Sequence, residues 1–505
     1  MRRALVIGAL TGLLAGCMVG PDYQRPATEA PQAYLYAPQS AADTADTAWW
    51  KQFDDPVLDE LIGAALASNK DLRIAAANVE QAAGVLTQTR SPLLPQVGYQ
   101  GGAGRFRFSQ DSTTALPSGL TNPTNAYGVL AAASWEIDLW GRIRRQSEAA
   151  RANLLATEDA RRGVILSLVA QVATSYIQLR GLDEQLDIAR RTLELYGASL
   201  KITQDKFEFG QVSQMNVAQV QSQYETAAAK IPQIRSQIVL TESALAILLG
   251  RDPGPIPRGK PILELGLPQV PAGMPSQLLE RRPDILQAEQ QLIAANAQIG
   301  AAKALYFPAI SLSGALGTSS TQLHELFTGP TRVWNYAGSL AGPIFTGGAI
   351  SGQVAQAEAS RKAALANYER AIQNAFADVD DTLSTHAQLV EQVAAEERLV
   401  EALRQYSELA RLQYDGGYAP YSTVLQAEQQ LFPEELTLAT TRAQLFASLV
   451  GIYRAMGGGW VDEADKLTPQ PATGSGPFAP GLPPAGPGSR SAPRTEAPSP
   501  APGPK

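Results

Sequence analysis

One segment of this 505-residue chain occurs twice, and the repeat limits the possible folds more than any other feature. The first copy, FEFGQVSQMNVAQVQSQ, spans residues 207–223, and the second, YDGGYAPYSTVLQAEQQ, spans residues 414–430. A numbering difference of 207 aligns the copies and places Gly210 on Gly417. In each copy a glycine ends one helical pattern and a second pattern follows, which predicts a helix–turn–helix hairpin. The chain is therefore predicted to be an internal duplication.

Long helices are predicted to lead into both turns. Apolar positions recur every seven residues, as in a coiled-coil seam, in the two series Ile165, Val172, Leu179, Leu186, Leu193, Leu200 and Leu365, Ile372, Val379, His386, Val393, Val400. The first series lies in a proline-free stretch of about 68 residues, which would form a helix of roughly 100 Å. A shorter helix is expected after each turn, with Pro232 predicted to kink the first and Pro433 to interrupt the second.

Each copy also contains two segments in which apolar residues alternate with small or polar ones. Residues 127–139 show this period of two most clearly, in YGVLAAASWEIDL. Strands are predicted at about 95–107, 126–139, 308–318 and 333–346, each long enough for the about 9–11 residues that a transmembrane strand needs. Four strands cannot close a barrel by themselves, and open strand edges cannot face lipid. The chain must then share a barrel: two chains would supply eight strands around a filled interior, and three would supply twelve around a lumen.

The N-terminus has the pattern of an export signal. Arg2 and Arg3 precede the apolar residues 4–14, a run too short to cross a bilayer. The junction LAGC at 14–17 resembles the lipobox of bacterial lipoproteins, in which the signal peptide is removed before a cysteine that then carries lipid. Residues 1–16 are therefore predicted to be a signal peptide and Cys17 the lipid-attachment residue. Met18 follows it, so no aspartate suggests retention in the inner membrane.

The mature chain is predicted to contain five parts. They are a lipidated N-terminal segment with an equatorial region (17–70), a first structural repeat (71–254), a linker (255–277), a second repeat (278–460) and a Pro/Gly-rich disordered tail (461–505).

Composition and missing motifs exclude several functions. The net charge of −7 argues against a nucleic-acid partner. One cysteine excludes a disulfide framework, and two histidines without ligand spacing give no metal site, so no cofactor is predicted. GxSxG, HExxH, Walker and paired-carboxylate patterns are missing, which argues against an enzyme. A periplasmic adaptor would also have long coiled-coil helices, but the alternation at 127–139 counts against it.

Five motifs together resemble those of TolC/OprM-type outer-membrane efflux lipoproteins, the NodT group. They are CMVGPDY (17–23), WWxxFxDPxLxxLI (49–62), DLWGR (138–142), RRPD (281–284) and GGGW (457–460). The resemblance covers the chain from Cys17 to about Trp460. It implies a mainly α fold with membrane β-structure, in which long coiled-coil helices form a periplasmic tunnel continuous with the shared twelve-stranded barrel of a homotrimer.

The resemblance also implies a function and partners. The chain would be a lipid-anchored channel of the outer membrane that extends into the periplasm and confers antibiotic resistance. Drugs and other small molecules would reach it from a periplasmic adaptor (membrane fusion protein) and an inner-membrane pump of the resistance–nodulation–division type. The alternative within the same fold is a channel for protein secretion that works with an ABC exporter.

The family's periplasmic gate falls on the repeated segment. The resemblance places Tyr414 at the position of the gate tyrosine and Asn216 at that of its partner. The positions that carry aspartate rings in the family fall on Thr423 and Gln426 here, with Asp415 and Glu428 nearby. Gly210 and Gly417 would form the helix-tip turns.

Overall fold

The computed structural model describes residues 18–27, 31, 33–36, 47–109, 121–270, 275–457 and 461–472. Cys17, the predicted signal peptide and residues 473–505 of the predicted tail lie outside the described residues. The chain divides into two compact units. Unit 1 comprises Met1–Tyr34, Ile74–Gly163 and Met274–Asp378, and unit 2 comprises Leu35–Arg73, Val164–Gly273 and Val379–Lys505.

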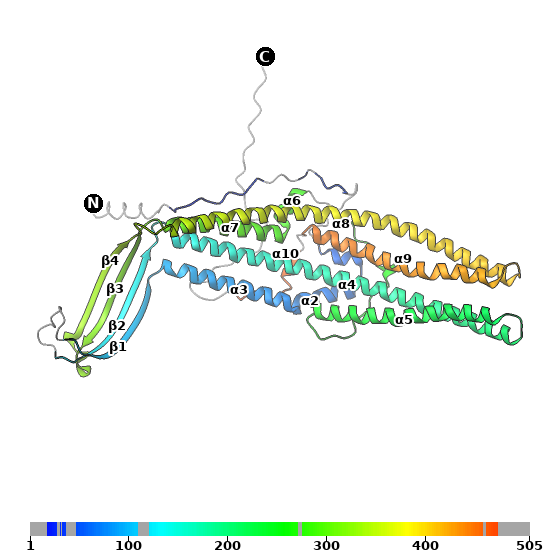
Figure 1. Cartoon of the computed structure of the whole chain (residues 1–505), viewed down its shortest axis with the longest axis horizontal. Helices are drawn as coiled ribbons and strands as arrows, with labels where there is room; N and C mark the ends of the chain where they lie inside the picture. The colour runs from blue at the N-terminus through cyan, green and yellow to red at the C-terminus, as the bar shows by residue number, and fades with distance from the viewer. Residues whose placement is uncertain are drawn as a thin grey trace, which may run out of the picture. The chain divides into compact units, whose positions relative to one another are not determined.

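Unit 1 contains one antiparallel sheet in the order β1-β2-β3-β4 (Figure 1). The strands are β1 (Gln96–Phe106), β2 (Thr124–Ile137), β3 (Ala309–Ser320) and β4 (Arg332–Ala341). All four lie where the alternating pattern predicted them, but β4 ends before the predicted residue 346. Pro343 has no N–H to donate, so the ladder cannot continue past it.

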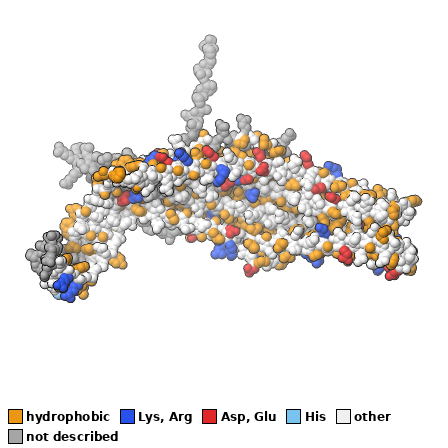
Figure 2. Space-filling model, viewed as in Figure 1, with side chains coloured by type: hydrophobic (Ala, Val, Ile, Leu, Met, Phe, Trp, Pro, Cys, Tyr) orange, Lys and Arg blue, Asp and Glu red, His pale blue; other side chains and the backbone are white. Residues whose placement is uncertain are grey.

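The register of the sheet separates two kinds of side chain. Tyr99 pairs with Ala131, Ala131 with Leu316, and Leu316 with Trp334, and these residues share the apolar face. The opposite face carries small or polar residues such as Ser134. Charged residues are sparse over the strands, and basic side chains gather at the loop end of the sheet (Figure 2). Among the described residues, β1 and β4 have no further strand beside them, so the sheet has two open edges.

The DLWGR motif joins β2 to α4 (Arg142–Glu208). The Asp138 carboxylate accepts from the backbone N–H groups of Ile143 (3.0 Å) and Arg144 (2.9 Å), so it caps the helix. Trp140 donates to the carbonyl of Pro308 (2.8 Å) and its ring stacks on Phe307. Asp138 and Trp140 of the motif therefore both have a structural role at this junction.

A buried arginine holds the segment that follows the predicted lipid site. The Arg145 side chain is 2% exposed and pairs with Asp22 (2.7 Å) and Glu148 (2.8 Å). The Arg145 side chain also donates to the carbonyl of Val19 (3.3 Å). The backbone N–H of Val19 in turn donates to Trp140 O (3.2 Å). The chain just after Cys17 is thus fixed to the junction between β2 and α4.

Three other helices lie wholly or mostly in unit 1: α3 (Lys70–Arg90), α6 (Pro275–Arg281) and α7 (Pro283–Ala304). Alanines of α7 pack on alanines of α4, whereas Ile285 and Leu292 pack on Tyr368 of α8 (Ala349–Asp415). In the RRPD motif, Arg282 pairs with Asp284 (2.7 Å) and Asp378 (2.9 Å). The short helices η2 (Ser91–Leu93), η4 (Leu323–Glu325) and η5 (Gly329–Thr331) adjoin the strands.

The lengths of the long helices reflect the duplication. α4 and α8 have 67 residues each, and α5 (Gln214–Leu248) and α9 (Tyr421–Ala455) have 35 residues each. Figure 1 shows α4 with α5 and α8 with α9 as two antiparallel hairpins. Pro232 and Pro433 lie inside helices that continue through them.

His386 packs on the seam as expected, with Nδ1 2.8 Å from Ser448 Oγ, and burial lowers the pKa of its imidazole.

The main core of unit 2 gathers around η1 (Trp49–Phe53) and α2 (Pro56–Ser68). The Trp49 ring stacks on Tyr453 with 5.2 Å between centroids. Asp55, 1% exposed, accepts from Val57 N (2.9 Å), Tyr176 Oη (2.7 Å) and Lys260 N (3.2 Å). This carboxylate joins α2, α4 and the segment before η3 (Ile262–Glu264), which lie far apart in the sequence.

The prediction of a disordered tail beginning at 461 is wrong for its first residues. α10 (Val461–Asp465) is helical, and Val461 and Ala464 are buried in the core that contains Trp49. These two residues are three apart, so one short helix turns both toward the core. The Pro/Gly-rich composition of the longer stretch obscured this signal.

Among the helices of the described residues, none combines the length and the apolar character needed to span a membrane.

Candidate functional site

The ends of the two hairpins in unit 2 have the same backbone geometry. Gly210 (φ +70°) donates to Phe207 O, and the following N–H, of Gln211, donates to Lys206 O. In the second hairpin Gly417 (φ +75°) donates to Tyr414 O, and the N–H of Tyr418 donates to Gln413 O. This pair of bonds ends a helix with a left-handed glycine. The prediction of glycine turns at Gly210 and Gly417 is confirmed.

The two hairpins begin their second helices differently. Ser213 caps α5: its hydroxyl accepts from Asn216 N (3.4 Å) and donates to Asn216 Oδ1 (2.7 Å). Pro420 precedes α9 and supplies no side-chain cap. The Asn216 side chain is therefore engaged in a local cap and does not bond to Tyr414 of the same chain.

Tyr414 instead contacts Lys206, at the end of α4. Lys206 Nζ donates to the Tyr414 hydroxyl (2.9 Å) and lies 4.9 Å from the centroid of its ring. The ring also packs edge-on against Tyr421, with 5.0 Å between centroids. Ala410, Val424 and Ala427 form the apolar surface beneath the two tyrosines. The second hairpin thus holds Tyr414 in place while the first supplies a cation to it.

Two further bonds join the hairpins along their length. Arg411 of α8 donates to Ser199 Oγ of α4 (3.3 Å). Farther from the turns, the Tyr196 hydroxyl donates to the backbone carbonyl of Glu428 in α9 (3.2 Å), while its ring packs against Phe432. We refer to the contacts Lys206–Tyr414, Ser199–Arg411 and Tyr196–Glu428 as the hairpin contacts.

The remaining predicted site residues occupy different environments. Asp415 and Gln426 are exposed, and Thr423 is half-buried. Glu428 is only 4% exposed, and burial raises the pKa of its carboxyl group. The structure therefore brings Tyr414 and Glu428 to the hairpin contacts but leaves Asp415 and Gln426 on the surface.

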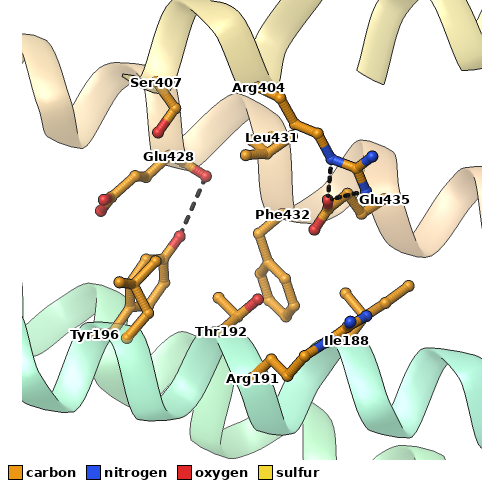
Figure 3. Close-up of a pocket in the computed structure, with 11 residues that line it drawn as sticks. Ile188, Arg191, Thr192, Tyr196, Arg404, Ser407, Glu428, Leu431, Phe432 and Glu435 are labelled. Atoms are coloured by element: carbon orange, nitrogen blue, oxygen red, sulfur yellow. Dashed lines mark hydrogen bonds and ion pairs between the residues drawn. The ribbon is translucent and has the colours of Figure 1, made fainter. Parts of the chain in front are cut away.

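A pocket of about 360 Å³ lies between α4, α8 and α9 beside the Tyr196–Glu428 bond (Figure 3). Ile188, Leu431 and Phe432 supply apolar walls. Arg404 and Glu435 form an ion pair at its edge, with Nη2 and Oε1 2.6 Å apart. Because Arg404 and Glu435 neutralise each other, Arg404 is not available as an ion-pair partner for Glu428, which lies on the opposite side of Phe432.

Lys206, Ser199, Arg411 and Tyr196 were missed as site residues. Lys206 and Tyr414 are 208 positions apart, and no short motif relates them. The one available signal was the place of Lys206 in the last turn of α4, where a basic residue is favoured by the helix dipole in any case.

A duplicated chain with an apolar-faced sheet and long helical hairpins is typical of an outer-membrane channel subunit. The model of the outer membrane efflux protein family matches residues 61–251 and 274–458. The chain therefore belongs to the outer membrane efflux protein family. This is a family of channel proteins rather than of enzymes, and the fold and outer-membrane location agree with the predictions.

Individual relatives agree with this assignment. The solvent efflux pump outer membrane protein SrpC of Pseudomonas putida is 36% identical over 456 residues, which cover 89% of this chain and 96% of SrpC. The cation efflux system protein CusC of Escherichia coli is 35% identical, covering 88% of this chain and 96% of CusC. The open-state crystal structure of the MtrE outer membrane channel of Neisseria gonorrhoeae superposes with a TM-score of 0.79 at 32% identity, covering 88% of this chain and 99% of MtrE. These relatives favour efflux over protein secretion.

Proposed function

We propose that three copies of this chain form the passive exit duct of a tripartite efflux system. A periplasmic adaptor and an inner-membrane pump of the resistance–nodulation–division type would deliver drugs and other small molecules to it. The observation that carries this proposal is the four-stranded sheet, whose apolar face suits lipid and whose edges, β1 and β4, are open. An open edge in lipid leaves backbone groups without partners, so neighbouring copies must cover it.

The function is tested by deleting the gene in its own host. The deletion strain should accumulate a fluorescent efflux substrate such as ethidium and become more sensitive to antibiotics, and the intact gene should restore both properties. Deletion of the cognate adaptor gene should give the same phenotype without additive effect. An unchanged accumulation together with a loss of secreted proteins would support the secretion alternative instead.

The oligomeric state gives a second test. We expect native mass spectrometry of the full-length protein in detergent to show three chains, which together contribute twelve strands, four from each. The same preparation should form channels in planar bilayers. A stable monomer that conducts ions would contradict the shared barrel.

Lipidation of Cys17 is a further prediction. Cells fed labelled palmitate should incorporate it into the wild-type protein but not into the Cys17→Ser variant, because the chain has no other cysteine. The sheet supplies membrane contacts of its own, so the variant should retain part of its efflux. Label in Cys17→Ser would refute the assignment.

We also propose that the hairpin contacts hold the periplasmic end of the channel closed. Tyr414 would act as the gate residue through Lys206 rather than through Asn216, because Asn216 caps α5. Thr423 and Gln426 carry no charge, so an acidic ring at their level is not proposed. Asp415 is exposed at this end of the hairpins, as are Asp205 and Glu208 of the first hairpin.

A further inference from the structure

Glu428 is buried between the hairpins without a partner for its carboxylate. The residue is 4% exposed, and its backbone carbonyl, not its side chain, receives the Tyr196 hydroxyl. Within the described part of the chain, the carboxylate forms neither a hydrogen bond nor an ion pair. Figure 3 shows this side chain beside Tyr196 and Ser407, on the far side of Phe432 from Glu435.

A second polar group on the same helix is in a similar position. Tyr421 lies seven residues before Glu428, two turns earlier on the same side of α9. Its hydroxyl is buried and interacts with Ser199 of α4, but without a hydrogen bond of normal geometry. Two buried polar groups close together that lack a well-formed hydrogen bond are unusual, since nearly all buried polar groups in folded proteins are hydrogen-bonded.

The charged and titratable groups around Glu428 do not compensate it. From α4 come Arg191 and Tyr196; from α8 come Arg404, Arg411 and Tyr414; from α9 itself come Tyr421 and Glu435. Arg404 is paired with Glu435. Arg411 attracts the carboxylate, but it forms no ion pair with it and donates to Ser199. A charged carboxylate in this position is therefore costly, and burial favours its neutral form.

We propose that Glu428 biases the channel toward opening by opposing closure of the two hairpins. Closing them removes most of the water from its carboxylate and supplies no protein partner, so that only its contact with the pocket remains, whereas separating α9 from α4 hydrates it fully again. The hairpin contacts work in the opposite direction, so the closed state depends on whether Glu428 carries a proton. This inference rests on the proposed gate function of the hairpin contacts.

The sign of the pH dependence follows from the burial. The pKa of Glu428 is raised in the closed arrangement, and it should be close to the ordinary value of about 4.3 when water reaches the carboxylate. The closed state thus binds the proton more tightly and is favoured at low pH. Between the ordinary value and the raised value, each increase in pH favours the open state. The equilibrium shifts about tenfold for each unit by which closure raises the pKa of one Glu428.

The test measures open probability in planar bilayers with the purified full-length protein as a function of pH. The wild type should open more as the pH rises above about 4.3. Glu428→Gln keeps the shape of the side chain but cannot ionise, so its open probability should stay low and lose this pH dependence. Glu408→Gln, which removes an exposed acid of α8, should titrate like the wild type.

Three outcomes decide between the possibilities. Loss of the pH dependence in Glu428→Gln alone supports the inference. A pH dependence in Glu428→Gln equal to that of the wild type overturns it, provided that the variant still forms the wild-type oligomer in native mass spectrometry. The Lys206→Met variant distinguishes the two proposals: if it opens the channel while Glu428→Gln behaves like the wild type, the gate stands and only the role of Glu428 is wrong.

Discussion

Asp55→Ala should destabilise the folded protein by about 3–5 kcal/mol, because it removes a buried acceptor that serves three donors. Val57 N–H, Tyr176 Oη–H and Lys260 N–H all donate to this carboxylate. Burial, and then the bond to Asp55, raise the pKa of Tyr176, so its hydroxyl remains protonated and would be left buried without its acceptor. The carboxylate also packs closely against the backbone of Gly259, since a Cβ on Gly259 would lie 2.0 Å from Asp55 Oδ1.

Thermal unfolding of the purified protein in detergent, followed by circular dichroism, measures this effect. Asp55→Asn keeps one acceptor oxygen and a good helix cap, so it should lose less than half as much stability. Glu60→Ala, an exposed acid on the same helix, serves as the control. If Asp55→Ala melts at the temperature of Glu60→Ala, the carboxylate does not hold α2 to α4.

The features that depend on local sequence could be predicted. The turns at Gly210 and Gly417 require a left-handed backbone conformation that few other residues tolerate, so they can be predicted from the sequence alone. The strands were also visible, because a sheet with one apolar face imposes a period of two. The cap formed by Ser213 and Asn216 could also have been recognised. A serine followed three residues later by a side chain that can hydrogen-bond back to it is a signal for the start of a helix.

The contacts that join distant segments could not be predicted. Tyr176 and Asp55 are 121 positions apart, and the pairing depends on which side of α4 faces α2 once both are packed. The same holds for Lys206 and Tyr414. The long helices have a repeating seam, but their flanking positions carry many polar residues, any of which could face the neighbouring hairpin. Only the packed structure selects among them.

The Lys206 contact leads to the second large effect. Lys206→Met removes the hydrogen bond to Tyr414 and the cation–π contact while keeping the length of the side chain. A hydrogen bond to a charged group contributes about 1.5–3 kcal/mol when buried, and a cation–π contact about 0.5–1 kcal/mol at exposed sites. Both groups are half-buried here, so solvent screening reduces the bond toward about 1 kcal/mol in each chain.

In the proposed gate the contacts of three chains act together, which would multiply this contribution and make single substitutions visible in channel recordings. Lys206→Met should raise the open probability by at least tenfold, since about 1.4 kcal/mol over the three contacts suffices for that change. Tyr414→Phe loses only the hydroxyl and keeps the ring against Tyr421, so it should open the channel less. The double variant should have the same open probability as Lys206→Met, because Tyr414→Phe removes nothing further once the ammonium is gone.

Lys201→Met, which replaces an exposed lysine of α4, should behave like the wild type. Cells that carry Lys206→Met should also admit vancomycin, and equal conductance and vancomycin sensitivity in all four variants would show that the contact does not close the channel.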